Sequence, residues 1–402
     1  MISVDEALKK VMELTPQLPP VRKSLAEIGS NVLAEDVCAQ SDVPMFTNSA
    51  MDGFAVHSED ISSVPVSLKL RGAVKAGDNL FKKMDRGEAI KIMTGAPLPD
   101  GADAVVMVEY TEQKGDTVIV NRTVKTGENV RFQGDEIKRG EIGLEMGTRI
   151  NPASAGFLAS LGRGYAEVFA KPRVGIVVTG DELVPPGLTL KPGQIWESNS
   201  TTVKSALSEF RIVPIYSGNA RDTREDLKEH LRDALEASDI LLVCGGISVG
   251  DYDFVQETLL GLGVERSFWR VAIKPGKPTF FGTQGEKLVF GLPGNPASVL
   301  VTYLIFVRPA ILRMMGRQDI HLPQVEAVLE EDLTIKGDRT NYMRGIFQRS
   351  SLDGISSVRR AGLQTSSILE SFSRANCLII LEKGKTEFKR GESVKIAVLP
   401  WS

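Results

Sequence analysis

The stretch Arg173-Val174-Gly175-Ile176-Val177-Val178-Thr179-Gly180-Asp181-Glu182-Leu183 has the pattern of a buried strand that ends in a polar turn. Its continuous apolar run is typical of a strand that is covered on both faces. Downstream, the pattern predicts helices near 200–210 and 224–236, and strands at 212–216 and 240–244. Strands that alternate with helices indicate a doubly wound α/β domain with a mostly parallel sheet. In such domains, ligands bind beyond the carboxyl ends of the strands.

Two turns follow predicted strands of this domain. The run Gly245-Gly246-Ile247-Ser248-Val249-Gly250 follows the strand at 240–244, and its backbone N–H groups can approach a phosphate closely. The run Gly291-Leu292-Pro293-Gly294-Asn295-Pro296-Ala297-Ser298 follows a strand at 287–290 and precedes a long apolar segment. It has the pattern of a rigid turn and a helix start, with Asn295 and Ser298 near the first N–H groups, which favours an anion.

A tight βα turn without a binding role is the alternative interpretation of the 291–298 run. Lys274-Pro275-Gly276-Lys277-Pro278 lies about one strand upstream and predicts two lysines near the same turn. The lysines favour an anion site over a turn that serves packing alone.

Acidic side chains also fall at the predicted strand ends of this domain. Carboxylates beside a phosphate site repel the ligand unless a hard cation such as Mg²⁺ lies between them. Solvation or helix N-capping is the alternative for each one taken singly. Their shared placement nevertheless predicts a divalent-cation site from among Asp181, Glu182, Asp222, Asp251 and Asp253.

The flanking segments have a different character. Residues 3–14 have the pattern of an amphipathic helix with Ser3 as its N-cap, and 153–161 that of a short helix. Short β runs at 66–70, 89–93, 104–108 and 117–120, and again from 319 to the run at 393–399, indicate two β-rich regions. We predict four domains: a linking domain of 1–45 plus 141–170, an inserted β-rich domain of 46–140, the α/β domain of 171–318, and a small all-β, barrel-like domain of 319–402.

Composition excludes several classes of function. A net charge of −3 and a pI near 5.9 give no electrostatic footprint for nucleic acid. Three separated cysteines and three histidines do not form a disulfide framework, a cysteine zinc site or a histidine-rich metal centre. The N-terminus lacks a signal pattern, and we expect no apolar run of membrane length. We therefore expect a cytoplasmic protein with no membrane partner.

Taken together, the motifs resemble those of a known family. Thr179-Gly180-Asp181-Glu182-Leu183, the Gly-Gly-x-Ser-x-Gly-x-x-Asp turn at 245–253, Ala272-Ile273-Lys274-Pro275-Gly276-Lys277-Pro278 and Gly291-Leu292-Pro293-Gly294-Asn295-Pro296 occur in this order. In this they resemble the molybdopterin molybdenumtransferases, relatives of the gephyrin E domain. Asn48-Ser49-Ala50-Met51-Asp52-Gly53-Phe54-Ala55 and Met93-Thr94-Gly95-Ala96-Pro97-Leu98-Pro99 resemble two further markers, so the resemblance spans almost the whole chain.

The resemblance implies an α/β domain of the molybdopterin-binding type and a role in molybdenum cofactor biosynthesis. The implied reaction inserts molybdate into adenylylated molybdopterin, releases AMP and depends on Mg²⁺ or another divalent cation. A homodimer is also implied, with the upstream molybdopterin adenylyltransferase as a further partner. The substrate carries phosphates and thiolates, so cationic donors and a divalent ion fit its chemistry.

The resemblance assigns roles to individual residues. The implied catalytic set is Asp52, Thr94, Arg131, Glu136, Glu182, Asp222, Asp253, Arg270 and Lys274. The implied binding set for the pterin substrate is Gly245, Gly246, Ser248, Gly250, Lys277, Pro293, Gly294, Asn295, Pro296 and Ser366. Asp222 and Asp253 are assigned to the metal.

This chain departs from the family pattern at two positions. The family commonly has Gly-Glu-Asp where this chain has Gly134-Asp135-Glu136, so either Glu136 or Asp135 takes the role of the family aspartate. Arg270 stands where the family often has lysine, which keeps the charge and adds a bidentate fork. A CinA-type pyrophosphate-cleaving enzyme and a non-catalytic, gephyrin-like scaffold are the alternative functions. The first lacks the Gly-Leu-Pro-Gly-Asn-Pro element, and the second has no need of the carboxylates and lysines.

Overall fold

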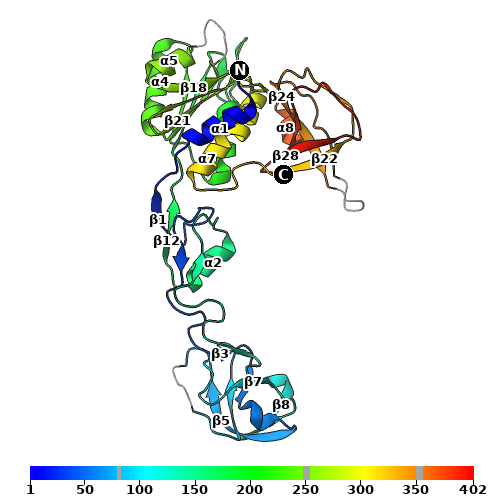
Figure 1. Ribbon diagram of the computed structural model, residues 1–402. Helices are drawn as coiled ribbons and strands as arrows, with labels where there is room; N and C mark the ends of the chain where they lie inside the picture. Colours follow the sequence, from blue (N-terminus) through cyan, green and yellow to red (C-terminus); the bar gives the residue numbers. More distant parts are fainter. Residues whose placement is uncertain (79–82, 248–253, 350–355) are drawn as a thin grey trace. The chain divides into compact units, whose positions relative to one another are not determined.

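The computed structural model describes residues 1–78, 83–247, 254–349 and 356–402 (Figure 1). The chain forms two compact units. The larger unit contains Met1–Val21, Ser30–Ala34 and Val168–Ser402, and the smaller unit contains Arg22–Gly29 and Glu35–Glu167.

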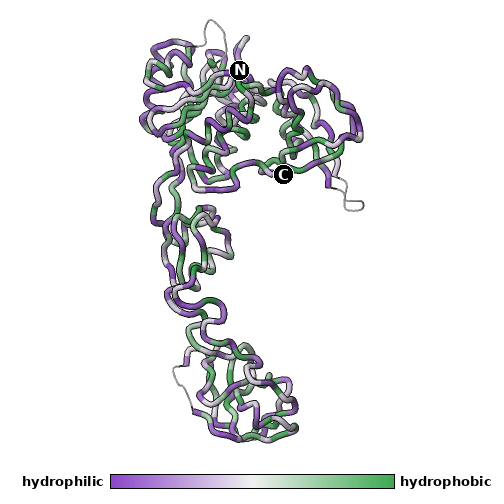
Figure 2. Tube along the Cα trace, viewed as in Figure 1, coloured by the Kyte–Doolittle hydropathy of each residue, from purple (hydrophilic) through white to green (hydrophobic). Residues whose placement is uncertain are grey.

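A six-stranded sheet forms the centre of the larger unit. The strands, in sheet order, are β16 (Tyr216–Ala220), β13 (Val174–Thr179), β17 (Ile240–Cys244), β21 (Lys287–Leu292), β20 (Phe280–Gln284) and β18 (Glu265–Trp269). Figure 2 shows apolar residues concentrated along these strands. Four neighbouring strands are parallel, and β20 alone runs in the opposite direction, pairing antiparallel with β21 and with β18. This confirms the predicted doubly wound, mostly parallel sheet.

Helices cover both faces of this sheet because successive strand side chains alternate between the faces. Ile176 and Val178 pack in one core cluster, whereas Val177 packs in the other. The first face carries α1 (Val4–Leu14), α3 (Asn199–Leu207), α6 (Pro296–Thr302) and α7 (Arg308–Met314). The second face carries α4 (Arg224–Ala237) and α5 (Val255–Gly261). The 3-10 turn η3 (Ser208–Phe210) extends α3, and the strands β14 (Leu183–Val184) and β15 (Ile195–Trp196) form a separate parallel pair.

The N-terminal helix begins as its sequence predicts. The hydroxyl of Ser3 accepts a hydrogen bond from the N–H of Glu6 at 3.1 Å, and Val4, Ala7 and Val11 are buried. This cap satisfies one of the first N–H groups of α1 and fixes where the helix starts.

The segment Pro296–Met314 corrects the expectation that no apolar run reaches membrane length. It joins α6 and α7 through the π-helical turn η4 (Tyr303–Val307) and is long and apolar enough to cross a membrane by composition. However, 89% of its most apolar window is buried inside the protein. It is therefore a core helix, and its apolar residues serve packing against the sheet.

The terminal region of the larger unit is a closed β-barrel. Successive pairings join β24, β25, β22, β28 and β26, and β26 pairs again with β24. The predicted all-β character of the terminal region is thus confirmed. The bounds are β19 (Ile273–Lys274), β22 (Gln324–Leu329), β23 (Leu333–Thr334), β24 (Thr340–Gln348), β25 (Ser357–Arg360), α8 (Glu370–Arg374), β26 (Cys377–Leu381), β27 (Glu387–Phe388) and β28 (Ser393–Val398).

The smaller unit is built around a second six-stranded sheet. Its order is β7 (Ala104–Met107), β4 (Gly53–Val56), β6 (Glu88–Ile92), β5 (Val66–Val74), β9 (Thr117–Val120) and β8 (Thr111–Lys114). Shorter elements complete it: β2 (Val37–Cys38), β3 (Asn48–Ser49), η1 (Ser58–Ile61), η2 (Val108–Tyr110), β10 (Val130–Arg131), β11 (Ile142–Leu144) and α2 (Pro152–Ser160). The strands β1 (Pro20–Ser24) and β12 (Tyr165–Phe169) pair where the chain passes between the two units.

Two predicted strand boundaries were wrong. The strand predicted at 212–216 begins only at Tyr216, because Pro214 has no N–H for the ladder and the register starts at the pair Tyr216–Gly175. The strand predicted at 287–290 continues through Gly291 and Leu292, which pair with Val243 and Cys244 of β17. The turn that follows β21 therefore begins at Pro293.

Gly291 lies within the sheet and is required there by packing. A Cβ at this position would lie 2.9 Å from Cγ2 of Ile247 and 3.0 Å from Cβ of Phe280, closer than side chains pack. We predict that Gly291→Ala lowers the free energy of unfolding by about 1–3 kcal/mol, as overpacking does. Urea unfolding measures the change. Gly261→Ala is the control because its added Cβ meets nothing within 4 Å. Equal stability of the two variants would contradict the packing role.

Candidate functional site

A cavity of about 520 Å³ lies at the carboxyl ends of the parallel strands in the larger unit. It lies where the α/β pattern predicts a ligand site. Six of the predicted site residues line it: Glu182, Gly246, Pro293, Gly294, Asn295 and Pro296. Other segments contribute Ile195, Trp196, Asn199, Pro278 and Ser367.

The glycine turn after β17 passes very close to β13. A Cβ on Gly245 would lie 2.8 Å from the carbonyl oxygen of Thr179, and one on Gly246 would lie 2.5 Å from Cγ2 of Val255. Both glycines also have positive φ, at 103° and 60°, which non-glycine residues rarely adopt. Only glycine therefore fits these two positions. The predicted residues Ser248, Gly250 and Asp253 lie outside the described residues.

The turn after β21 is fixed by the terminal region, which brings Ser366 into the site. The carbonyl of Ser366 accepts from the N–H of Ala297 at 3.0 Å, and its hydroxyl accepts from Nδ2 of Asn295 at 3.1 Å. Sequence reasoning alone placed these residues in separate domains. The contacts show that the predicted binding residues Asn295 and Ser366 are neighbours, and Ser367, next to Ser366, lines the cavity.

These same contacts correct the prediction that the start of α6 offers its N–H groups to an anion. Pro296 has no N–H, Ala297 donates to Ser366, and Ser298 and Val299 donate to the carbonyl of Asn295. Asn295 is the N-cap residue, but its side chain makes no cap bond. Among the described residues of this turn, the N–H groups of Gly294 and Asn295 make no hydrogen bond. The anion-binding capacity therefore lies in the turn before the helix.

Two carboxylates meet at the ends of β13 and β16. The N–H of Asp181 donates to Asp222 at 3.4 Å, and the N–H of Asp222 donates to Asp181 at 3.2 Å. Glu182 is exposed and lines the cavity beside them. Across the ranges that the structure describes, no three His, Cys, Asp or Glu side chains are placed to hold a metal together. The pair can provide oxygen ligands for Mg²⁺, which completes its shell with water and substrate phosphates, so the residues fit such an ion.

The predicted cations lie on one loop whose stem is closed by two backbone hydrogen bonds. The N–H of Arg270 donates to Thr279, and the N–H of Val271 donates to Lys277, each at 3.0 Å. Lys274 pairs in register with Asn341 of the barrel and lines a second cavity of about 260 Å³. Lys277 is exposed and lines neither cavity. Neither lysine lines the larger cavity with the 291–298 turn, and the expectation that both lie near this turn stays a prediction.

Arg344 also lines this second cavity, and sequence reasoning missed it. Its guanidinium is 1% exposed and donates to Ser371 and to the carbonyls of Leu363, Gln364 and Thr365. Burial lowers the pKa of Arg344 to about 10, so the group stays charged at neutral pH. A buried cation with only neutral partners leaves a positive potential beside Lys274. The sequence offered one signal for this residue: an arginine at an inward-facing position of the strand 340–348.

Asn199 is a second residue that sequence reasoning missed. Its Nδ2 donates to the carbonyl of Gly294 at 2.8 Å, which ties the first turn of α3 to the wall of the larger cavity. Asn199 is 7% exposed, and its Oδ1 has no hydrogen-bond partner among the residues that the structure describes. The polar run Glu197-Ser198-Asn199 directly before the predicted helix was the only signal in the sequence.

The predicted residues of the smaller unit form two local groups. One oxygen of Asp52 accepts from the N–H of Thr94 at 2.7 Å and from its hydroxyl at 2.9 Å. Arg131, Asp135 and Glu136 line a cavity of about 420 Å³. Asp135 accepts from the N–H of Phe132 at 2.6 Å, whereas the Glu136 carboxylate makes no hydrogen bond to the described residues. This difference favours Glu136 for the role of the family aspartate.

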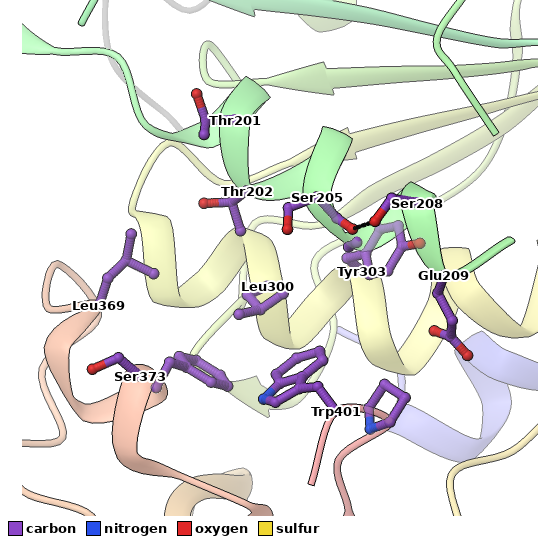
Figure 3. Close-up of a pocket in the computed structure, with 13 residues that line it drawn as sticks. Thr201, Thr202, Ser205, Ser208, Glu209, Leu300, Tyr303, Leu369, Ser373 and Trp401 are labelled. Carbon is purple, nitrogen blue, oxygen red and sulfur yellow. Dashed lines mark hydrogen bonds between the residues drawn. The ribbon is translucent and has the colours of Figure 1, made fainter. Parts of the chain in front are cut away.

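A further cavity of the larger unit, of about 700 Å³, contains none of the predicted site residues. Leu300, Tyr303 and Trp401 face it from the core helix and the chain end (Figure 3). Its lining lacks the cations and glycine turns that an anionic ligand needs. It is therefore not the candidate site.

Comparison with known proteins gives a consistent family. Residues 2–162 match the MoeA N-terminal region (domain I and II), 175–313 match the probable molybdopterin binding domain, and 326–399 match the MoeA C-terminal region (domain IV). The molybdopterin molybdenumtransferase of Haemophilus influenzae is 34% identical over 400 residues, which cover 98% of each chain. That of Bacillus subtilis is 33% identical over 417 residues, covering 100% of this chain and 96% of the other.

A solved structure supports the same assignment. The molybdopterin biosynthesis MoeA protein of Pyrococcus horikoshii superimposes with a TM-score of 0.83 at 31% identity, covering 99% of this chain and 100% of the other. The fold and its strand-end cavity thus define a multidomain protein of the MoeA type. The chain belongs to the molybdopterin molybdenumtransferase family.

The Asp52–Thr94 contact has a measurable pH signature. The backbone N–H of Thr94, and secondarily its hydroxyl, hold the pKa of Asp52 below its ordinary value. The resulting stabilisation is present at neutral pH and is lost as the pH falls through the lowered folded-state pKa. We predict that Thr94→Ala raises the pKa of Asp52 only partly, because the backbone donor remains. A carboxyl ¹³C NMR titration measures both proteins. An unchanged midpoint in the variant would contradict the role of the hydroxyl.

Proposed function

We propose that the larger unit inserts molybdate into adenylylated molybdopterin and releases AMP, with Mg²⁺ or another divalent cation bound at the strand ends. The observation that carries this proposal is a set of cations without carboxylate partners. Lys274 and Arg344 line the second cavity, and Arg270 and Lys277 lie on the loop that contributes to both cavities. In the described part of the chain, Arg270, Lys274, Lys277 and Arg344 form no ion pair. Such cations keep their charge for an anionic ligand.

Adenylylated molybdopterin fits these charges and turns. Its pyrophosphate suits the cavity of about 520 Å³, where Gly246, Gly294 and Asn295 provide backbone close to the ligand. Its planar rings suit the exposed face of Trp196, whose indole N–H is already bonded to the carbonyl of Leu188 at 2.9 Å. Molybdate, a small oxyanion, suits the cavity beside Lys274 and Arg344. One loop contributes Lys274 to this cavity and Pro278 to the other.

Asp181 and Asp222 would hold the divalent cation, with Asp253 as the further ligand that the family resemblance implies. The bound ion supplies Lewis-acid polarisation of the pyrophosphate. The reciprocal backbone bonds of the two carboxylates fix their orientation before the ion binds. Glu182, which lines the cavity, would face the nucleotide part of the substrate.

We also propose that the protein acts as a cytoplasmic homodimer, with a molybdopterin adenylyltransferase as the upstream enzyme that supplies its substrate. A CinA-type activity would leave the barrel and the Lys274–Arg344 cavity without a role. A pure scaffold would need neither the uncompensated cations nor the glycine turns. Both alternatives are therefore less consistent with the geometry than the transferase.

The carboxylate pair can be tested by substitution. We predict that Asp222→Asn lowers molybdate-dependent AMP release from adenylylated molybdopterin at least about tenfold, because one anionic oxygen ligand is lost. Raising the Mg²⁺ concentration is expected to restore part of the rate. The measurement is AMP by chromatography, with and without molybdate. If the wild-type protein released AMP at the same rate with and without molybdate, the proposed function would be overturned. A variant with wild-type Mg²⁺ dependence would overturn the metal assignment alone.

The second cavity makes a separate prediction. Lys274→Met is expected to raise the KM for molybdate about tenfold or more, while the KM for adenylylated molybdopterin changes less, because the lysine faces the smaller cavity. Steady-state kinetics with each substrate varied in turn measure the split. Lys383→Met, an exposed lysine of the barrel, is the matched control. Equal effects on both KM values would show that the two cavities do not divide the substrates.

A further inference from the structure

Arg270 and Trp269 have an unusual mutual placement. Consecutive residues of a strand point to opposite faces, so their side chains do not normally touch. Here the guanidinium carbon of Arg270 lies 4.1 Å from the centre of the Trp269 ring. The φ of Arg270 is +70°, in the left-handed region, directly after the end of β18. This backbone turn allows the two neighbours to stack.

The strained conformation of Arg270 is held by contacts on both sides. Its N–H donates to Thr279 at 3.0 Å, and its carbonyl accepts from the N–H of Ile2 at 3.3 Å. A positive φ costs conformational free energy for a residue with a Cβ, and such costs persist where the surroundings over-determine the backbone. The result is an arginine whose direction is set by its backbone and by the ring beneath it.

The other end of Trp269 reaches the candidate site. Its Nε1 donates to the carbonyl of Ile247 at 3.0 Å, and Nε2 of Gln256 donates to the same carbonyl at 3.2 Å. Ile247 directly follows the glycine pair and lines the cavity of about 520 Å³. Trp269 is therefore in contact with both the cavity wall and the arginine.

The kind of partner also distinguishes Arg270 from other arginines. Arg224 lies over the ring of Phe254 at 4.8 Å, but it is also paired with Glu257 at 2.5 Å. Within the ranges that the structure describes, Arg270 has the ring and no carboxylate. An aromatic face attracts and orients a cation without neutralising it. The full charge of Arg270 thus remains available to an anionic ligand.

We propose that Trp269 is a positioning residue: its ring holds Arg270 ready for the anionic substrate, while its indole N–H fixes Ile247 in the wall of the cavity. This inference rests on the proposed function for the identity of the substrate. It assigns to Trp269 a role in anion binding that acts through Arg270.

A double-mutant cycle tests the coupling of the two side chains. The probe is inorganic pyrophosphate, with binding to the full chain measured by calorimetry. We expect Arg270→Met and Trp269→Leu each to weaken binding about five- to tenfold. The double variant is expected to bind pyrophosphate as tightly as the single variant that has the lower affinity. Trp269→Phe keeps a ring but loses the N–H, so it is expected to retain most of the affinity.

A matched control addresses general effects of losing an aromatic side chain. In the smaller unit, the guanidinium carbon of Arg122 lies 4.7 Å from the centre of the Tyr110 ring. Tyr110→Leu is expected to leave pyrophosphate affinity unchanged. Thermal melting of each variant shows whether it is folded. If Trp269→Leu does not fold, Trp269→Met, which also removes the ring, takes its place in the same cycle with Arg270→Met.

Three outcomes would overturn the inference: multiplicative losses in the double variant, no loss in Trp269→Leu, or no pyrophosphate binding by the wild-type protein. Failure of the proposed function has a different signature. The wild-type protein would then release no AMP in response to molybdate, while the non-additive loss of pyrophosphate binding would still be measured.

Discussion

The parallel arrangement of β16, β13, β17 and β21 is the constraint on which the rest of the larger unit depends. Parallel strands bring their carboxyl ends to one edge of the sheet, so the turns that follow them meet there whatever their separation along the chain. The carboxylates after β13 and β16, the glycine pair after β17 and the Pro293 turn after β21 are neighbours for this reason. The core helix and the glycines at 245, 246 and 291 allow the close packing that holds these strands together.

The charge pattern around that edge is the second organising feature. About half of the arginines in the described part of the chain meet a carboxylate, as Arg173 does with Asp239 at 2.7 Å and Arg308 with Glu209 at 2.7 Å. Such pairs cancel charge and stabilise the fold locally. By contrast, Arg270, on the loop that contains Lys274, is held by a ring, and Arg344, in the second cavity, is held by neutral carbonyls and a hydroxyl. These cations are oriented without being neutralised, which is the arrangement that a phosphate-bearing substrate and an oxyanion require.

The terminal barrel participates in the site as well as closing the chain. The contacts of Ser366 with the α6 turn and the pairing of Lys274 with Asn341 join the barrel to the loops of the α/β sheet. Because of these contacts, the first N–H groups of α6 donate hydrogen bonds to acceptors within the protein. The rigid proline turn therefore shapes the cavity, and the direct anion contacts fall to the glycines and to the neighbouring cations.

The sequence by itself determined the fold class, the closed β character of the terminal region and the positions of the chemistry-bearing turns, because apolar periodicity, glycine and proline report local backbone geometry. It predicted Glu182, Gly246 and Asn295 at one edge of the sheet, and all three line the same cavity, since the meeting of strand ends follows from topology alone. It misplaced the strand at 216–220 and the end of β21, where pairing with β13, β17 and β20 overrides local pattern. Only the tertiary structure decided that Lys274 faces a second cavity, that Arg344 is a buried uncompensated cation and that Asn199 supports Gly294. Those features depend on contacts between residues 19 to 95 positions apart, to which no local pattern corresponds.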